Sequence, residues 1–193
     1  MTLLRAVLLC AFPLGVMAQP VDSMDVPEKL LFHAETVFSP QALAGSALYA
    51  GFLQADNAPR EWGQGGGAYG ERFASTVATT AIHGALAFGL DSALHQDPRY
   101  YRSADTGFWR RTGHAFRGTI LTRTDRGGET LSTWRIGSAY GSEFLSNEWY
   151  PGRLNTVRLG LLEGTIRLGF DFASNLGSEF WPDVKHKLLH QKP

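Results

Sequence analysis

The fold is decided by residues 71–94, which read ERFASTVATTAIHGALAFGLDSAL and contain no proline. Small residues recur every four positions, at Ala81, Ala85, Gly89 and Ala93, so one side of a helix here carries almost no side-chain bulk. Larger apolar side chains fall on the other faces. The pattern predicts a long helix that is buried on most sides and that other helices can approach closely.

Five further helices are expected around this one. Helical spacing of apolar residues predicts them at residues 24–38, 41–54, 107–122, 132–147 and 155–177, with Ser39-Pro40 ending the first and capping the second. Small residues recur four apart in Gly137-x-x-x-Gly141 and Gly160-x-x-x-Gly164. No segment alternates strictly enough to predict a strand. The expected fold is all-α: a compact bundle of about five to six helices, held by close packing of glycine and alanine.

Glycine and proline mark the connections between these helices. Residues 62–70, WGQGGGAYG, contain too many glycines for a stable helix or strand and are expected to form a loop. Pro98 disfavours helical backbone at Asp97 and so ends the long helix before it. Residues 124–128, TDRGG, form a turn by composition.

The chain begins with a stretch typical of an export signal. Arg5 precedes an apolar run at residues 6–16, and Val16-Met17-Ala18 fits a cleavage site, so residues 1–18 are interpreted as a signal peptide. Residues 19–193 would then form a single helical domain with a polar C-terminal tail from about residue 188. Cys10 lies within the signal, which would leave the domain without disulfides or thiolate ligands. We expect export to the periplasm or cell envelope, with membrane association left open.

The charge pattern narrows the expected partners. Basic and acidic residues number 18 each, so nucleic acid is not expected as a partner. Arginines nevertheless gather between residues 99 and 126. A helical membrane protein is the main alternative to a water-soluble bundle, because small-residue rows also join helices in lipid. Charged residues in the body of the last expected helix argue against it: Arg158, Glu163, Arg167 and Asp171.

Several phrases taken together resemble a family of exported bacterial proteins of unknown function. They are WGQG at 62–65, YGERF at 69–73, HQDPRY at 95–100, TRTD at 122–125 and SNEWYP at 146–151, and they are spread over most of residues 19–193. The resemblance implies no reaction, cofactor or partner.

One candidate site lies on the long helix. Asp91 and His95 are four residues apart and so are expected to be neighbours, with His83 near the same line and Asp97 just beyond the helix end. Two imidazoles and a carboxylate are able to bind Zn²⁺, and a histidine beside an aspartate is able to act as an acid–base pair. We favour a simpler interpretation, a helix-end pair and a core histidine, and expect no metal or other cofactor.

The arginine-rich window is the second candidate site. Guanidinium groups bind phosphate or carboxylate in a forked geometry, and Arg110, His114 and Arg117 are spaced to share a helical face. The candidate anion-binding residues are Arg99, Arg102, Arg110, Arg117 and Arg123. The alternative is that these arginines pair with acidic residues and tie helix ends together.

Two hypotheses about function follow. The first is a non-catalytic envelope protein whose arginine- and aromatic-rich edge contacts an anionic partner, either lipid or another envelope component, with self-association also open. The second is a hydrolase or transferase acting on an anionic substrate through groups in residues 83–126. In this second hypothesis the acid–base residues are His83, Asp91, His95 and Asp97.

Overall fold

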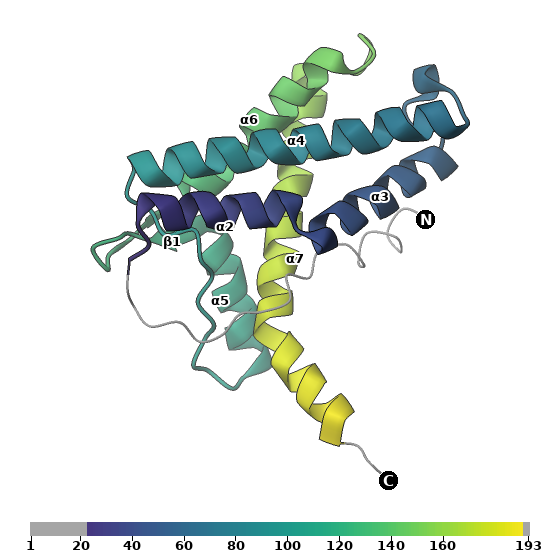
Figure 1. Cartoon of the computed structure of the whole chain (residues 1–193). Helices are drawn as coiled ribbons and strands as arrows, with labels where there is room; N and C mark the ends of the chain where they lie inside the picture. Colours follow the sequence, from purple (N-terminus) through teal and green to yellow (C-terminus); the bar gives the residue numbers. More distant parts are fainter. Residues whose placement is uncertain (1–22, 191–193) are drawn as a thin grey trace.

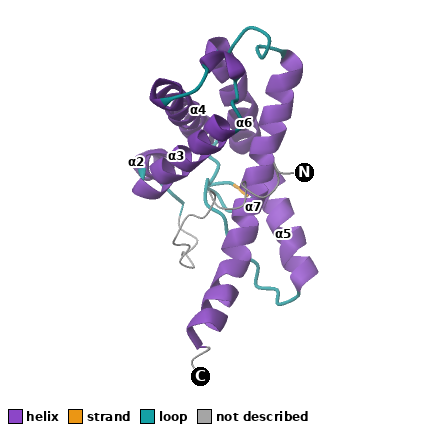
Figure 2. Ribbon diagram, turned by 90° about the vertical axis from the view of Figure 1, so that its right-hand side faces the viewer, coloured by secondary structure: helices purple, strands orange, loops and turns teal. Residues whose placement is uncertain are grey.

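The computed structural model describes residues 23–190, and it confirms the expected all-α bundle (Figures 1 and 2). The expected signal segment at residues 1–18 lies outside this part of the chain. Within it the chain forms six α-helices, one small hairpin and two short 3₁₀ helices. Their bounds are α2 Val26–Phe38, α3 Pro40–Ala55, η2 Arg60–Trp62, α4 Gly66–Ala93, α5 Phe108–Ile120, β1 Leu121–Arg123, β2 Glu129–Leu131, α6 Thr133–Ser146, η3 Asn147–Trp149 and α7 Val157–His190.

The corner between α2 and α3 forms as the sequence predicts. Asp25 and Glu28 make a reciprocal capping box at the start of α2. Ser39 then serves both helices, because its backbone N–H donates to the Glu35 carbonyl and its side chain accepts from the backbone N–H of Ala42. Pro40 follows as the first residue of α3, where its missing N–H costs nothing.

The glycine-rich segment is shorter as a loop than expected, because α4 already begins at Gly66. Only Gly63 and Gly65 adopt positive φ, at 71° and 101°, and they make the turn into the helix. The guanidinium of Arg72, fully buried on α4, holds this turn by donating to the carbonyls of Ala58 at 2.8 Å and Gly63 at 3.0 Å. A side chain of α4 therefore holds the turn that leads into the same helix. The number of glycines in the sequence does not reveal this contact.

The helices cross in a small number of close contacts. In Figure 1, α4 lies across the molecule with α2 beside it, and α7 crosses behind them and continues past the bundle with α5 alongside. Figure 2 shows the same pairing of α5 with α7 from the side. Helix α6 packs between α4 and α7 and so connects the two halves of the structure.

The expected close packing occurs at the glycine pairs of α6 and α7. Any side chain on Gly137 or Gly141 of α6 would place its Cβ 2.8 to 2.9 Å from the leucines of α4, Leu90 and Leu86 respectively. Gly164 of α7 meets the ring of Tyr140 of α6 in the same way. The Tyr140 ring lies against Gly164 with several atoms, so this glycine sets how near α6 and α7 approach, whereas the leucine methyl groups at Gly137 and Gly141 are ends of flexible side chains.

The small-residue row of α4, in contrast, does not pack against the protein. Ala85, Gly89 and Ala93 are exposed, so the expectation of a helix buried on most sides is wrong. Small residues permit a close approach but do not require one, and α4 packs instead through its opposite face, which includes Gly84 and Ala87. Among the described residues α4 is the one helix long and apolar enough to cross a membrane, and only 22% of its most apolar window is buried.

Two other expectations need correction. The sequence predicts no strand, but β1 and β2 pair antiparallel with Leu121 opposite Leu131, and Gly127 makes the turn at φ 86°. Three-residue strands are too short to produce a visible alternation in the sequence. Helix α7 also runs on to His190, through Pro182, so residues 188–190 of the expected polar tail are helical.

Candidate functional site

The residues expected to form a catalytic group have separate partners. Asp91 is fully buried on α4, and its carboxylate lies 2.6 Å from Nε2 of His33 on α2. The expected Asp91–His95 pair does not form, because α4 ends at Ala93 and His95 turns away with φ 53°. The exposed ring of His95 lies 3.7 Å from the carboxylate of Asp125 instead.

His83 belongs to a hydrogen-bonded pair between α4 and α6. Its Nε2 lies 3.0 Å from Oγ of Ser138, and the hydroxyl of Ser138 donates to the carbonyl of Arg135 at 3.2 Å. The Ser138 hydroxyl thus lies between the His83 ring and a backbone carbonyl of its own helix. Burial, with the positive charges of Arg167 and Arg135 nearby, holds the pKa of His83 well below its usual range.

Asp97 anchors its own turn. Its carboxylate accepts from the backbone N–H of Arg99 at 2.9 Å, from the Arg99 guanidinium at 2.6 Å and from the hydroxyl of Tyr101 at 2.7 Å. Burial alone would raise the pKa of Asp97, but the hydrogen bonds from Arg99 and Tyr101 outweigh it and lower that pKa. The carboxylate is therefore held ionised by the residues that follow it, as the HQDPRY phrase folds back on itself.

These four residues thus do not share one concave site. None of them lines the cavity between α3 and the N-terminal part of α7 or the cavity beside Trp62 and Trp149. Within residues 23–190 no group of three histidine, cysteine, aspartate or glutamate side chains is placed to hold a metal ion. The catalytic role predicted for them gains no geometric support.

The candidate anion-binding arginines differ in what they contact within the protein. Arg99 binds Asp97, and the guanidinium of Arg123 lies 4.1 Å from the centre of the Tyr101 ring. Arg102 is exposed, but it donates to the backbone carbonyl of Glu179 at 3.2 Å. Arg110 and Arg117 are also exposed, on α5, and within residues 23–190 their ion pairs are those with the exposed carboxylates of Asp105 and Glu129. Surface pairs of this kind are weak, so these two guanidiniums are accessible to another anion.

Glu179 on α7 is a buried acceptor that the sequence analysis did not single out. It is fully buried, and its carboxylate accepts from Tyr100 at 2.7 Å, from the backbone N–H of Ser103 at 2.6 Å and from Arg111 at 3.2 Å. The carboxylate thereby ties the 98–107 connection and the inner face of α5 to α7. In the sequence Glu179 is a single glutamate followed by two aromatic residues. That pattern does not distinguish a buried glutamate from one that faces water.

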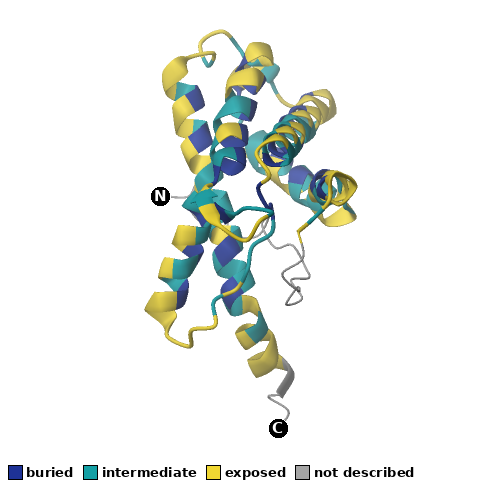
Figure 3. Cartoon of the chain, turned by 90° about the vertical axis from the view of Figure 1, so that its left-hand side faces the viewer, coloured by how far each residue is buried: buried dark blue, intermediate teal, exposed yellow. Residues whose placement is uncertain are grey.

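The exposed side of α5 combines aromatic rings with these accessible arginines. Trp109 is 80% exposed, and Phe108 and Phe116 are also exposed, whereas Arg111 and Thr119 are buried on the opposite side. Figure 3 shows exposed residues along the outer side of α5 and on the C-terminal part of α7. We call this surface the α5 edge and define it by Phe108, Trp109, Arg110, Phe116 and Arg117.

Comparisons with known proteins do not assign this surface. No protein-family model matches the chain, and neither a curated protein nor a solved structure matches it.

Like α5, helix α2 buries polar side chains and exposes apolar ones. Its buried face carries Lys29 and His33, while Leu30 and Leu31 on the other side are more than half exposed. Nζ of Lys29 lies 2.8 Å from the carboxylate of Asp125 near the hairpin turn, so its charge is compensated inside the protein. Polar side chains inside and apolar side chains outside are the reverse of an ordinary soluble core. The described surface therefore offers apolar and aromatic side chains on several helices.

Proposed function

We propose that this protein is a non-catalytic helical protein of the cell envelope whose α5 edge binds the surface of an anionic lipid bilayer. The observation that carries the proposal is the orientation of α5, which exposes Trp109 and Phe116 and buries Arg111. A helix in contact with water alone would gain by the opposite orientation.

The chemistry of the edge favours lipid over an envelope protein as the partner. Aromatic rings partition to the boundary between headgroups and acyl chains, and arginines beside them attract anionic headgroups. On the neighbouring turn of α7, Val184 and Leu188 are exposed together with Lys185 and Lys187, which extends the same combination of apolar and basic side chains. An interfacial helix buries its apolar face only to the depth of the headgroup boundary, so this binding needs no spanning segment.

Vesicle binding tests the proposal. The purified protein is mixed with neutral phosphatidylcholine vesicles or with vesicles that also contain phosphatidylglycerol, and bound protein is separated by flotation. We expect binding to the anionic vesicles that weakens as salt is raised, because the headgroup attraction is screened. The Trp109→Ala variant is expected to lose most of this binding. Recovery of all the protein in the soluble fraction, with both vesicle types, would overturn the proposal.

A further inference from the structure

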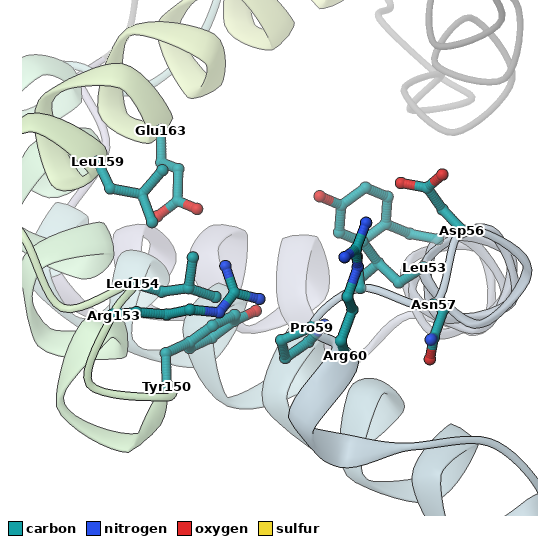
Figure 4. Close-up of a pocket in the computed structure, with 12 residues that line it drawn as sticks. Leu53, Asp56, Asn57, Pro59, Arg60, Tyr150, Arg153, Leu154, Leu159 and Glu163 are labelled. Carbon is teal, nitrogen blue, oxygen red and sulfur yellow. The ribbon is translucent and has the colours of Figure 1, made fainter.

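A cavity of about 330 Å³ lies away from the α5 edge, between α3 and the N-terminal part of α7 (Figure 4). The connection after α3 forms one wall and the turn after η3 forms its base. This volume is at the lower end of the range for small-molecule sites. Three leucines give it apolar lining: Leu53, Leu154 and Leu159.

Charged groups of opposite sign lie on opposite walls of this cavity. Figure 4 shows Arg60 on the α3 side and Glu163 on the α7 side, with Tyr150 and Arg153 between them at the base. Tyr49 also lines the space. Asp56 lies on the α3 side together with Arg60, and tyrosine hydroxyls that are able to hydrogen-bond to either sign of charge line the same space.

Neither end has its charge compensated by an ion pair within the protein. Among the described residues, Arg60 and Glu163 form no ion pair and no side-chain hydrogen bond, and the nearby Arg153 is already paired with Glu61. Burial, with the Glu143 carboxylate nearby, raises the pKa of Glu163 to about 7. The carboxyl therefore lacks a cation that would stabilise its ionised form.

We propose that this cavity binds a small zwitterion, with its primary ammonium group on Glu163 and its phosphate group on Arg60. A simple anion would bind Arg60 but leave Glu163 without a cation, and a simple cation would bind Glu163 but leave Arg60 without an anion. A phosphate fits the cationic end because a guanidinium binds its oxygens in a forked geometry. The ammonium suits the acidic end because it donates hydrogen bonds and lies beside the rings of Tyr49 and Tyr150.

Calorimetric titration with three probes tests this assignment. Phosphoethanolamine carries both charges, inorganic phosphate carries one, and ethylamine carries the other. We expect phosphoethanolamine to bind about tenfold or more tightly than either partial probe, since each end contributes its own charge-assisted contact. Inorganic phosphate binding as tightly as phosphoethanolamine would overturn the proposal, as would the absence of phosphoethanolamine binding at about 10 mM.

Two variants and two matched controls locate the binding. Glu163→Gln and Arg60→Gln each remove one charge and are expected to weaken phosphoethanolamine binding about tenfold or more. Glu148→Gln and Arg158→Gln remove the same charges from exposed positions that do not line the cavity, and we expect them to bind as the unaltered protein does. Equal weakening by variants and controls would contradict the assignment. If Glu163→Gln does not fold, Arg60→Gln carries the test, since Arg60 is exposed and its side chain is not needed to hold the fold.

Proton release gives an independent readout. The titratable and charged groups around Glu163 are Glu143 on α6, Arg167 on α7, Tyr49 on α3, and Tyr150 and Arg153 in the turn before α7. An ammonium group bound at Glu163 lowers the pKa of its carboxyl, so binding at pH 7 releases protons, which titration in buffers of different ionisation enthalpy measures. The Glu163→Gln variant lacks this carboxyl, so proton release of the same size in that variant would overturn the proposal.

The zwitterion has two possible sources, the headgroup of phosphatidylethanolamine and free phosphoethanolamine. A competition experiment, in which vesicles displace bound phosphoethanolamine, distinguishes the two sources. Displacement of phosphoethanolamine by vesicles containing phosphatidylethanolamine, but not by phosphatidylcholine vesicles, supports the headgroup, and displacement by neither supports the free compound. The Trp109→Ala variant keeps phosphoethanolamine binding in this proposal, so failure of the α5 edge and failure of the cavity are separate results.

Discussion

Nε2 of His33 and the carboxylate of Asp91 lie 2.6 Å apart, and this contact joins the buried face of α2 to the last turn of α4. One turn earlier on α2, Lys29 binds Asp125 beside the hairpin. Two polar contacts on one helix face thus connect three elements, in a position where an ordinary bundle would have leucines. A helix attached in this way depends on keeping both partners of each pair.

Removing one partner of the buried pair should be costly. Asp91→Asn replaces the charged acceptor of the His33 contact by a neutral amide in a site closed to water, and we expect a loss of about 1 to 3 kcal/mol in the free energy of unfolding. Urea denaturation followed by circular dichroism measures this loss. The control is Asp105→Asn, which weakens only an exposed pair and should change stability by less than about 0.5 kcal/mol. Equal effects of the two substitutions would show that the buried pair does not anchor α2 to α4.

Two glycines on one helix provide a matched test of close packing. In Gly164→Ala the new methyl group collides with the ring of Tyr140, and we expect a loss of about 1 to 3 kcal/mol. Gly169 lies on the same helix, and a methyl group added there would meet nothing within 4 Å. Gly169→Ala should therefore stabilise the protein by about 0.4 to 1 kcal/mol through the helix preference of alanine. Thermal unfolding should show a lower melting temperature for Gly164→Ala and a higher one for Gly169→Ala than for the unaltered protein.

The sequence predicts the helices well and their buried faces poorly. Capping by Ser39 and the glycine pairs of α6 and α7 are local signals, and the structure uses them as expected. The small-residue row on α4 is exposed rather than packed, because Gly/Ala spacing indicates which faces are small, not which faces touch.

The candidate site residues are harder to predict for a related reason. Spacing along α4 places Asp91 beside His95, but the partner of Asp91 in the structure is His33, 58 residues away along the chain. A pattern confined to one helix contains no information about a pairing between two. The exposed position of Arg110 and Arg117 is compatible with the predicted anion-binding edge, whereas Arg99 binds Asp97 and Arg102 binds the Glu179 carbonyl through contacts that spacing does not specify.

The pH dependence of stability should report the environment of Glu163. Its pKa of about 7 in the folded protein lies above the ordinary value of 4.5, so the folded state binds more protons between these two values. Stability should therefore fall as pH rises from about 4.5 to 7, and allowing for partial solvent screening we expect a change of about 1 to 2 kcal/mol from this group. Glu163→Gln should remove that part of the pH dependence, being more stable than the unaltered protein at pH 8 and similar to it at pH 4.5. Parallel pH profiles for the two proteins would contradict the assigned environment.

The α5 edge should respond differently to loss of charge and loss of aromatic surface. In Arg110→Gln/Arg117→Gln two headgroup contacts disappear, and we expect affinity for vesicles containing phosphatidylglycerol to fall about tenfold at low salt, with little difference remaining at high salt. Trp109→Ala removes apolar contact instead, so its loss of binding should persist at high salt. Arg126→Gln is the charge control, because Arg126 is exposed in the hairpin turn rather than on α5. Flotation at two salt concentrations separates the effects, and an equal loss in Arg126→Gln would mean that net charge rather than the α5 edge directs the protein to lipid.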